Sequence, residues 1–598
     1  MIAALVEGGC KSEAPLNLPP GAKVLWLAAA DDVPTLDPAI GYDTASWTFE
    51  QAIFDTLVRY GDATVELEPD LALSWEISKD ATVFTFHLRH DARFSNGLQV
   101  TGADFKYAIE RVLRPSTRSK GSEYYRGIVG AVDFAAGRAS AVSGIALPDP
   151  YTLVFHLTGP DPIFIHKLTM PFAAAVPRED AEKWGEDFSH HVVGSGAFKL
   201  SQWIAGQRLA LVRNPYYFAK GLPKLDAVVE MMGVNDELEW LKYEAGEVDV
   251  STISPAEFPH VIQTPRLKAL TIHNVTVTTD YLGMNCQMAP FDDLRVRQAF
   301  NYAVNKEKLL ALLNGRGVVA RGVLPPGLPG YTPDVKGYPY DPEKARQLLE
   351  AAGVHKDFAP VLWLRADQTM LILAQSVQQD LALVGVSLAI KPVAWGPLLE
   401  AIREPHGAQV FMLAWEADFP DPENFLEVLF SRRQWGSNND TFFYDPQVDR
   451  LMAQAAPIAD LSRRFAIYQQ AERIIIRQAP WVFLYHPVNY VIRQPWVHEY
   501  VINPMRPSRL EKVWVSNHQG GGEGPKRPIF HPVSARLGGG SSAAYSIGRI
   551  KNHLTSGSSD VGPCGIVSAM HPARPSIAAI ASSPPVKLCV ASRTIPTR

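Results

Sequence analysis

Residues 410–422, VFMLAWEADFPDP, join an apolar strand to the start of a helix. The run from Val410 to Trp415 fits a buried strand, and Asp421-Pro422 is typical of a helix entry because proline suits the first helical turn. Asp418 lies between the two elements. A strand that leads directly into a helix indicates a mixed α/β fold.

The same alternation continues on both sides of this segment. Period-two alternation predicts a strand at TVFTFHLR, with Phe84, Phe86 and Leu88 on one face. Thr101 and Asp104 predict the capped start of a helix over FKYAIERVL. Further helices are expected at 47–57, 292–304, 341–353 and 460–476, and further strands at 24–29, 151–157, 209–214, 228–232, 361–365 and 387–392.

Composition excludes several classes of protein. The chain has 598 residues, of which 46% are hydrophobic, which is enough for about four domains with large cores. Its 57 basic and 62 acidic residues give a net charge of −5, so no basic field exists to attract nucleic acid. The four cysteines are too few for a disulfide scaffold and lack the spacing of zinc ligands, which argues against structural zinc. The sequence contains no run of 18 apolar residues, so no membrane-spanning segment is expected.

Motifs of catalysis and cofactor binding are missing. The sequence has no phosphate-binding loop GxxxxGK[ST], no HExxH and no GxSxG. His190 and His191 are adjacent, so in an extended chain their side chains point to opposite sides and do not share a metal ion. Carboxylate pairs such as Asp418 and Asp421 have no nucleophile or histidine at a telling spacing. We therefore expect no catalytic residue, no cofactor and no metal site.

The two ends of the chain differ from its body. Residues 1–21 run from a short apolar segment through Gly8-Gly9-Cys10 into a proline-rich stretch, which resembles the end of a bacterial lipoprotein signal with Cys10 as the lipid-bearing residue. The alternative is a disordered end. Residues 516–598 are rich in Gly, Pro and Ser and hold nine basic against two acidic residues, which predicts a disordered tail that is either a linker or a non-native extension.

Several segments in a fixed order resemble the bacterial extracellular solute-binding proteins of family 5, the oligopeptide- and dipeptide-binding components of ABC importers. The resemblance covers about residues 22–515. It rests on 34–38 (PTLDP), 53–58 (IFDTLV), 68–75 (EPDLALSW), 94–105 (FSNGLQVTGADF), 193–198 (VGSGAF), 214–217 (NPYY), 290–299 (PFDDLRVRQA) and 415–422 (WEADFPDP).

The resemblance implies a two-lobed, type II periplasmic-binding-protein-like α/β fold. The first lobe would comprise 22–50, 193–263 and 487–515, with an additional α/β region, 51–192, inserted in it. The second lobe would be 264–486. Ligand would lie between the lobes, and a hinge motion would close them over it and present the closed form to the membrane permease.

The resemblance also implies a set of ligand contacts. Asp418 matches the carboxylate that receives the terminal ammonium of a peptide, while a turn-capping role is the structural alternative. Trp415 and Trp395 match cleft-lining positions that contact varied side chains, with an ordinary core role as the alternative. The remaining contacts implied are Ala414, Glu416, Tyr42 and Thr44, with Arg403 as a partner for an acidic group of the ligand or a solvated helix charge.

From these residues we expect a binding protein that is exported to the periplasm or cell surface, is a monomer, and delivers oligopeptides or dipeptides to the permease subunits of an ABC importer. Cargo is not fixed by the scaffold, so an opine, a nickel complex or a sugar is an alternative. A secreted hydrolase that acts through carboxylates such as Asp418 and Asp421 is the alternative from another class of protein.

Overall fold

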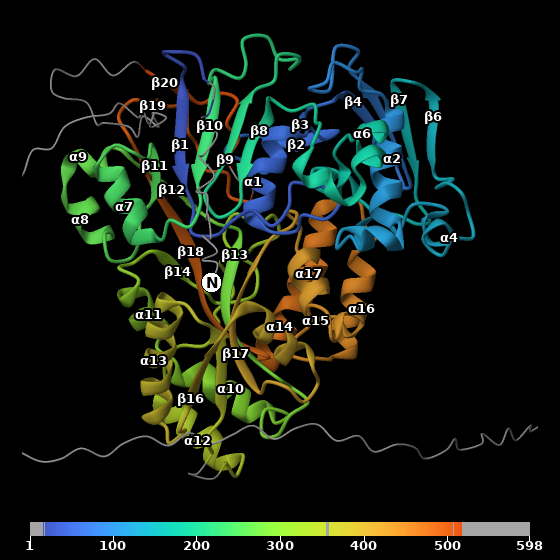
Figure 1. Cartoon of the computed structure of the whole chain (residues 1–598). Helices are drawn as coiled ribbons and strands as arrows, with labels where there is room; N and C mark the ends of the chain where they lie inside the picture. Colours follow the sequence, from blue (N-terminus) through green and yellow to red (C-terminus); the bar gives the residue numbers. More distant parts are fainter. Residues whose placement is uncertain (1–15, 17, 355–357, 506–507, 517–598) are drawn as a thin grey trace, which may run out of the picture. The chain divides into compact units, whose positions relative to one another are not determined.

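The computed structural model describes residues 16, 18–354, 358–505 and 508–516 (Figure 1). Cys10 and residues 517–598 lie outside them, so the predictions of a lipid-bearing cysteine and a disordered tail stay predictions. The described chain is a mixture of helices and strands, as the sequence indicates.

A four-stranded sheet near the amino terminus has the order β1-β10-β9-β8. Within this sheet β1 and β10 are parallel to each other, and the other neighbouring strands are antiparallel. Helix α1, Thr44–Ile53, begins earlier than the sequence predicts because the Asp43 carboxylate caps it, accepting the Ser46 N–H at 2.8 Å. The strands of this sheet are β1 Val24–Ala28, β8 Phe198–Ile204, β9 Arg208–Arg213 and β10 Ala227–Met231.

A second sheet is antiparallel throughout, with the order β4-β5-β7-β6. Phe84, Phe86 and Leu88 are buried, which confirms the predicted alternation. Helix α2, Gly102–Leu113, starts as predicted, since the Thr101 N–H donates to the Asp104 carboxylate at 2.7 Å. The strands are β4 Ala72–Ile77, β5 Val83–Leu88, β6 Ile145–Asp149 and β7 Thr152–His156, and the short helices nearby are α3 Ser122–Tyr125, α4 Ala131–Ala135, α5 Phe164–Lys167 and α6 Arg178–Trp184.

The largest sheet has eight strands and is built around β18, Trp481–Arg493. One part of β18 pairs with β11 and β12, and the other part pairs with β13 and β14. The path continues β13-β17-β15-β16, in which β15 is parallel to both of its neighbours. The other strands are β11 Val250–Thr252, β12 Thr271–Val275, β13 Thr278–Met284, β14 Gly317–Val319, β15 Val361–Arg365, β16 Ala389–Val393 and β17 Val410–Glu416.

Helices cover the large sheet and enclose separate apolar clusters. Val296 and Phe300 belong to one cluster, and Phe425 and Tyr468 belong to another. The helices are α10 Leu294–Ala303, α11 Lys306–Leu312, α12 Pro342–Ala351, α13 Gln368–Ala382, α14 Trp395–Arg403, α15 Glu423–Phe430, α16 Pro446–Ala455 and α17 Leu461–Gln478. Three further helices, α7 Asp236–Glu244, α8 Phe258–Gln263 and α9 Pro265–Lys268, surround a smaller cluster near Trp240.

Two short strand pairs complete the described fold. The hairpin of β2, Val58–Tyr60, and β3, Leu67–Pro69, places Tyr60 in the cluster that contains Phe425. Near the end of the described chain, β19, Val497–His498, pairs with β20, Trp514–Val515. The predicted boundary at residues 486 and 487 falls inside β18, and the lobe boundaries remain predictions.

Candidate functional site

Three parallel strands of the large sheet end at a common edge. Because β15, β16 and β17 run in the same direction, their carboxyl ends gather there, which is where open α/β sheets bind ligands. Trp395 follows β16 at the start of α14 and is 50% exposed. Ala414 and Glu416, among the last residues of β17, are exposed, and Trp415 is half-buried. The structure therefore gathers five of the predicted site residues, counting Asp418 just beyond β17, at one edge.

The end of β17 offers backbone groups on one side only. Its residues 410–416 pair with β13, with Glu416 opposite Thr278 and Ala414 opposite Asp280. On the other side, β15 pairs with Val410 and Phe411, and in the described part of the chain no strand pairs with the segment from Met412 to Glu416. An extended peptide can add to such an edge as a further strand.

Asp418 is held by a network of neutral hydrogen-bond donors. Its side chain is buried, and its Oδ2 accepts from the Tyr124 hydroxyl at 2.8 Å, the Tyr42 hydroxyl at 3.0 Å and Asn424 Nδ2 at 3.2 Å. Asn424 is fully buried on α15, and its Oδ1 accepts from the Asp418 N–H and from Trp415 Nε1, each at 3.0 Å. One amide therefore fixes both Asp418 and Trp415.

Both tyrosines reach Asp418 from distant parts of the sequence. Tyr42 precedes α1, and Tyr124 belongs to α3; their hydroxyls are 2.9 Å apart. The two rings pack against Phe172, with centroid separations of 5.6 and 6.4 Å. Burial, and then the charge of Asp418, raises the pKa of Tyr124 well above its ordinary value, so this phenol stays a donor.

Charged groups from α5 lie beside this network. Lys167 Nζ donates to Asp161 at 2.7 Å. Burial alone would lower the pKa of Lys167, but Asp161 and Glu423 raise it above its ordinary value. Burial lowers the pKa of His166 to about 4, so this imidazole is neutral at neutral pH. Helix α5 thus presents one cation to the segment that follows Asp418.

Asp421 has a structural role in this geometry. It is 2% exposed, and both of its carboxylate oxygens accept from Arg464, at 3.0 and 3.1 Å. Arg464 Nη2 also donates to Glu423 at 2.8 Å. An Asp bound on both oxygens by a buried guanidinium is an ion-pair residue, which argues against an acid/base pair with Asp418.

The other two predicted contacts are the first residue of α1 and the last residue of α14. Thr44 is exposed at the first position of α1. Arg403 is half-buried at the end of α14, near Asp440: burial raises the pKa of Asp440 to about 7, and the charge of Arg403 acts in the opposite direction. The Nε atom of Arg403 is buried and has no hydrogen-bond partner among the described residues.

Three contributors were missed from the sequence. Tyr124 and Asn424 donate to Asp418, and Arg365 ends β15 at the same sheet edge, where it is exposed and lies 3.9 Å from Asp31. The only signal for Asn424 was its position six residues after Asp418, at the helix entry. Nothing in the sequence linked Tyr124 to residue 418.

The family of this chain follows from a match of its central region. Residues 66–437 match the model of the bacterial extracellular solute-binding proteins, family 5. The chain belongs to this family. As a family 5 solute-binding protein, it has a curated relative in the dipeptide-binding protein of Escherichia coli, which is 31% identical over 486 residues, 77% of this chain and 88% of the relative. The heme-binding protein A of Haemophilus influenzae is 29% identical over 76% of this chain and 85% of its own length.

Solved structures agree with the fold of this solute-binding protein. A periplasmic binding protein from Helicobacter pylori, in complex with a peptide, matches with a TM-score of 0.72 and 27% identity over 83% of this chain and 98% of that one. These matches confirm the two-lobed periplasmic-binding-protein fold expected from the sequence. Within the described ranges, no helix is long and apolar enough to cross a membrane, and no group of three or more His, Cys, Asp or Glu side chains is placed to hold a metal ion.

Proposed function

We propose that this solute-binding protein captures short peptides by their free amino terminus and delivers them to the permease subunits of an ABC importer. The observation that carries the proposal is the juxtaposition of Asp418 with the open edge of β17. The strand edge supplies main-chain hydrogen bonds that do not depend on side-chain identity, and the carboxylate supplies the charge that an ammonium group needs.

Neutral donors around Asp418 support this role. Tyr42, Tyr124 and Asn424 orient the carboxylate without neutralising it. An ammonium group that leaves water needs an opposite charge to offset its desolvation, and this carboxylate provides one. Arg365 at the same sheet edge offers an exposed cation for an acidic group of the ligand, a role that was predicted for Arg403.

Two experiments test the proposal. Mass spectrometry of natively purified and then denatured protein identifies the retained cargo, and we expect short peptides with free amino termini. Calorimetric titration then compares each peptide with its acetylated form, for which we expect a large loss of affinity. Equal affinity for both forms would refute the role of Asp418, and a single non-peptide species would keep the scaffold and replace the cargo.

A non-peptide cargo is the main alternative, since one relative is named for heme. Another relative, from Shigella dysenteriae, is named for glutathione, which is itself a tripeptide and therefore agrees with a peptide cargo. The hydrolase alternative is disfavoured by the ion pairing of Asp421. Recovery of intact peptide after prolonged incubation would dismiss it. A lipid anchor at Cys10 is a separate proposal, and intact mass of protein extracted from membranes would test it.

A further inference from the structure

A small cavity lies beside α1 and the hairpin of β2 and β3. It has a volume of about 30 Å³ for the centres of water-sized molecules. Glu50 and Gln51 line it from α1, Arg59 lines it from β2, and Arg509 lines it from the segment before β20. Polar and charged side chains therefore line the cavity together with apolar ones such as Phe54.

Several polar atoms in the lining have no hydrogen-bond partner among the described residues. They are both carboxyl oxygens of Glu50, Nε2 of Gln51 and Nε of Arg59, all of which are buried. Glu50 is 0% exposed. A buried polar group without a partner destabilises the fold, so four such atoms around one cavity indicate an occupant that both donates and accepts hydrogen bonds.

The position of Glu50 is closely fixed by its neighbours. A Cβ atom on Gly41 would overlap the Glu50 carboxyl group, and the Trp47 Nε1 group donates to the Gly41 carbonyl oxygen at 3.0 Å. The Glu50 carboxyl group is therefore packed against Gly41, in the loop before α1, where it has no hydrogen-bond partner among the described residues. Burial, and then the charges of Asp37 and Asp43, raises the pKa of Glu50 well above its ordinary value, which favours the neutral carboxyl group.

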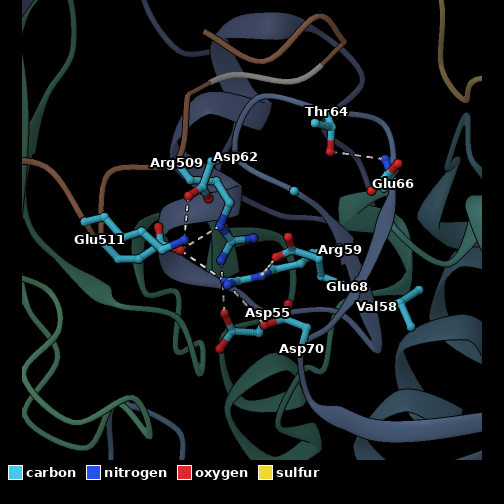
Figure 2. A network of polar contacts seen from close by, with 12 residues as sticks. Asp55, Val58, Arg59, Asp62, Thr64, Glu66, Glu68, Asp70, Arg509 and Glu511 are labelled. Atoms are coloured by element: carbon cyan, nitrogen blue, oxygen red, sulfur yellow. Dashed lines mark hydrogen bonds and ion pairs between the residues drawn. The ribbon is translucent and has the colours of Figure 1, made fainter. Parts of the chain in front are cut away.

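The charges beyond the cavity decide what kind of occupant it takes. Figure 2 shows Arg59 and Arg509 among Asp55, Asp70 and Glu511. Glu511 Oε1 accepts from Arg59 Nη1 at 3.1 Å and from Arg509 Nε at 2.9 Å. Asp70 lies 3.9 Å from Arg59, and Asp55 lies 3.9 Å from Arg509.

These five groups balance one another. Burial, and then the charge of Asp70, raises the pKa of Asp55 to about 8 against the opposing charge of Arg509, so Asp55 is mostly protonated at neutral pH. Two guanidinium groups then face two carboxylates, Asp70 and Glu511. The half-exposed Glu68 also lies 3.9 Å from Arg59 Nε, so the surroundings carry no net positive charge, which disfavours an anion. The donors Arg59 Nε and Gln51 Nε2 in the lining disfavour a cation.

We propose that this cavity binds one or two ordered water molecules, which accept hydrogen bonds from Arg59 Nε and Gln51 Nε2 and donate to the Glu50 carboxyl group. A buried water needs about 10–15 Å³ by the same measure of volume, and it needs two to four polar partners. The cavity meets both requirements. The waters connect α1, which begins beside Tyr42, to the arginine cluster formed by Asp55, Arg59, Asp70, Arg509 and Glu511.

A high-resolution crystal structure of the protein, with a second crystal soaked in sodium bromide, tests the occupant. We expect density within hydrogen-bonding distance of both Arg59 Nε and Gln51 Nε2, without anomalous signal from bromide. A bromide peak at this position would overturn the proposal in favour of an anion site. Absence of density would overturn it in favour of a dry cavity.

Magnetic relaxation dispersion of water tests the same proposal in solution. Gln51→Leu removes one donor from the cavity, and we expect the signal of long-lived internal water to fall by about one molecule. Gln409→Leu is the matched control, because Gln409 is also half-buried but its Nε2 donates to the Ala289 carbonyl oxygen at 3.0 Å. An unchanged signal in a folded Gln51→Leu protein would contradict the water site.

Discussion

Two groups of carboxylates in this protein are stabilised in opposite ways. Asp418 accepts hydrogen bonds from two phenols and an amide, all of which are neutral. In the arginine cluster, Asp70 and Glu511 face two guanidinium groups. The first arrangement orients a negative charge and preserves it, whereas the second cancels negative charge within the fold. The difference separates a carboxylate suited to an external cation from carboxylates that hold the structure together.

The largest effect is expected from breaking the arginine cluster. Arg509→Leu leaves Asp70 and Glu511 with one guanidinium group, and removing one partner of buried charges costs about 3–5 kcal/mol of unfolding free energy. Urea denaturation measures this loss. Arg295→Leu is the control, because Arg295 forms an exposed pair with Asp293 and should cost about 1 kcal/mol or less. Equal losses in the two variants would mean that burial does not strengthen the cluster.

Removing the charge of Asp418, in contrast, should weaken peptide binding and leave folding nearly intact. Asp418→Asn keeps the shape of the side chain but removes its charge, and we expect peptide affinity to fall by about 2–5 kcal/mol. Calorimetric titration measures the fall, with a thermal unfolding curve to show that the variant is folded. The acetylated peptide is the internal control: it has no ammonium group, so both proteins should bind it equally weakly.

Asn424 tests whether orientation of Asp418 matters apart from its charge. Asn424→Leu removes the amide that holds both Asp418 and Trp415, and we expect affinity for free peptides to fall by about 1–3 kcal/mol. Asn439 is an equally buried asparagine that bonds only within its own loop region, to Ser431 and Phe443 among others. Asn439→Leu should therefore cost stability but leave the preference for free over acetylated peptide unchanged. If the two variants shift that preference alike, Asn424 has no specific role.

The last prediction concerns the pH dependence of stability, an effect that is small per pH unit and accumulates over several units. The pKa of Asp55 is raised from 3.8 to about 8 in the folded protein, so its stabilising contribution is complete below pH 3.8 and is lost as the pH rises toward 8. Stability should fall by up to about 1.4 kcal/mol per pH unit in that window. In Asp55→Asn the slope should become shallower, because other buried carboxyl groups with raised pKa values, such as Asp440, still contribute to it, as measured by urea denaturation at several pH values. An unchanged slope in the variant would assign it to other groups alone.

Local patterns were predictable from the sequence, and long-range contacts were not. The capped start of α2 depends on Thr101 and Asp104, and that of α12 on Asp341 and Pro342, so neighbouring residues determine both helices. The exposed edge near Trp395 and Glu416 was implied by the family resemblance. In contrast, Tyr124 and Asp418 are separated by 294 positions, and their contact depends on how α3 packs. The arginine cluster joins the hairpin of β2 and β3 to residues near β20, which no spacing pattern indicates.

Strand β18 also has a practical consequence for protein engineering. It pairs with β11 and β12 through residues 488–493 and with β13 and β14 through residues 481–487. A fluorescent reporter inserted there to make an optical sensor would separate four strands at once. The turn at Gly385, between α13 and β16, is a better insertion point, because it has a positive φ and open space around it. A sensor built from this scaffold should therefore keep β18 uncut and carry its reporter at such a turn.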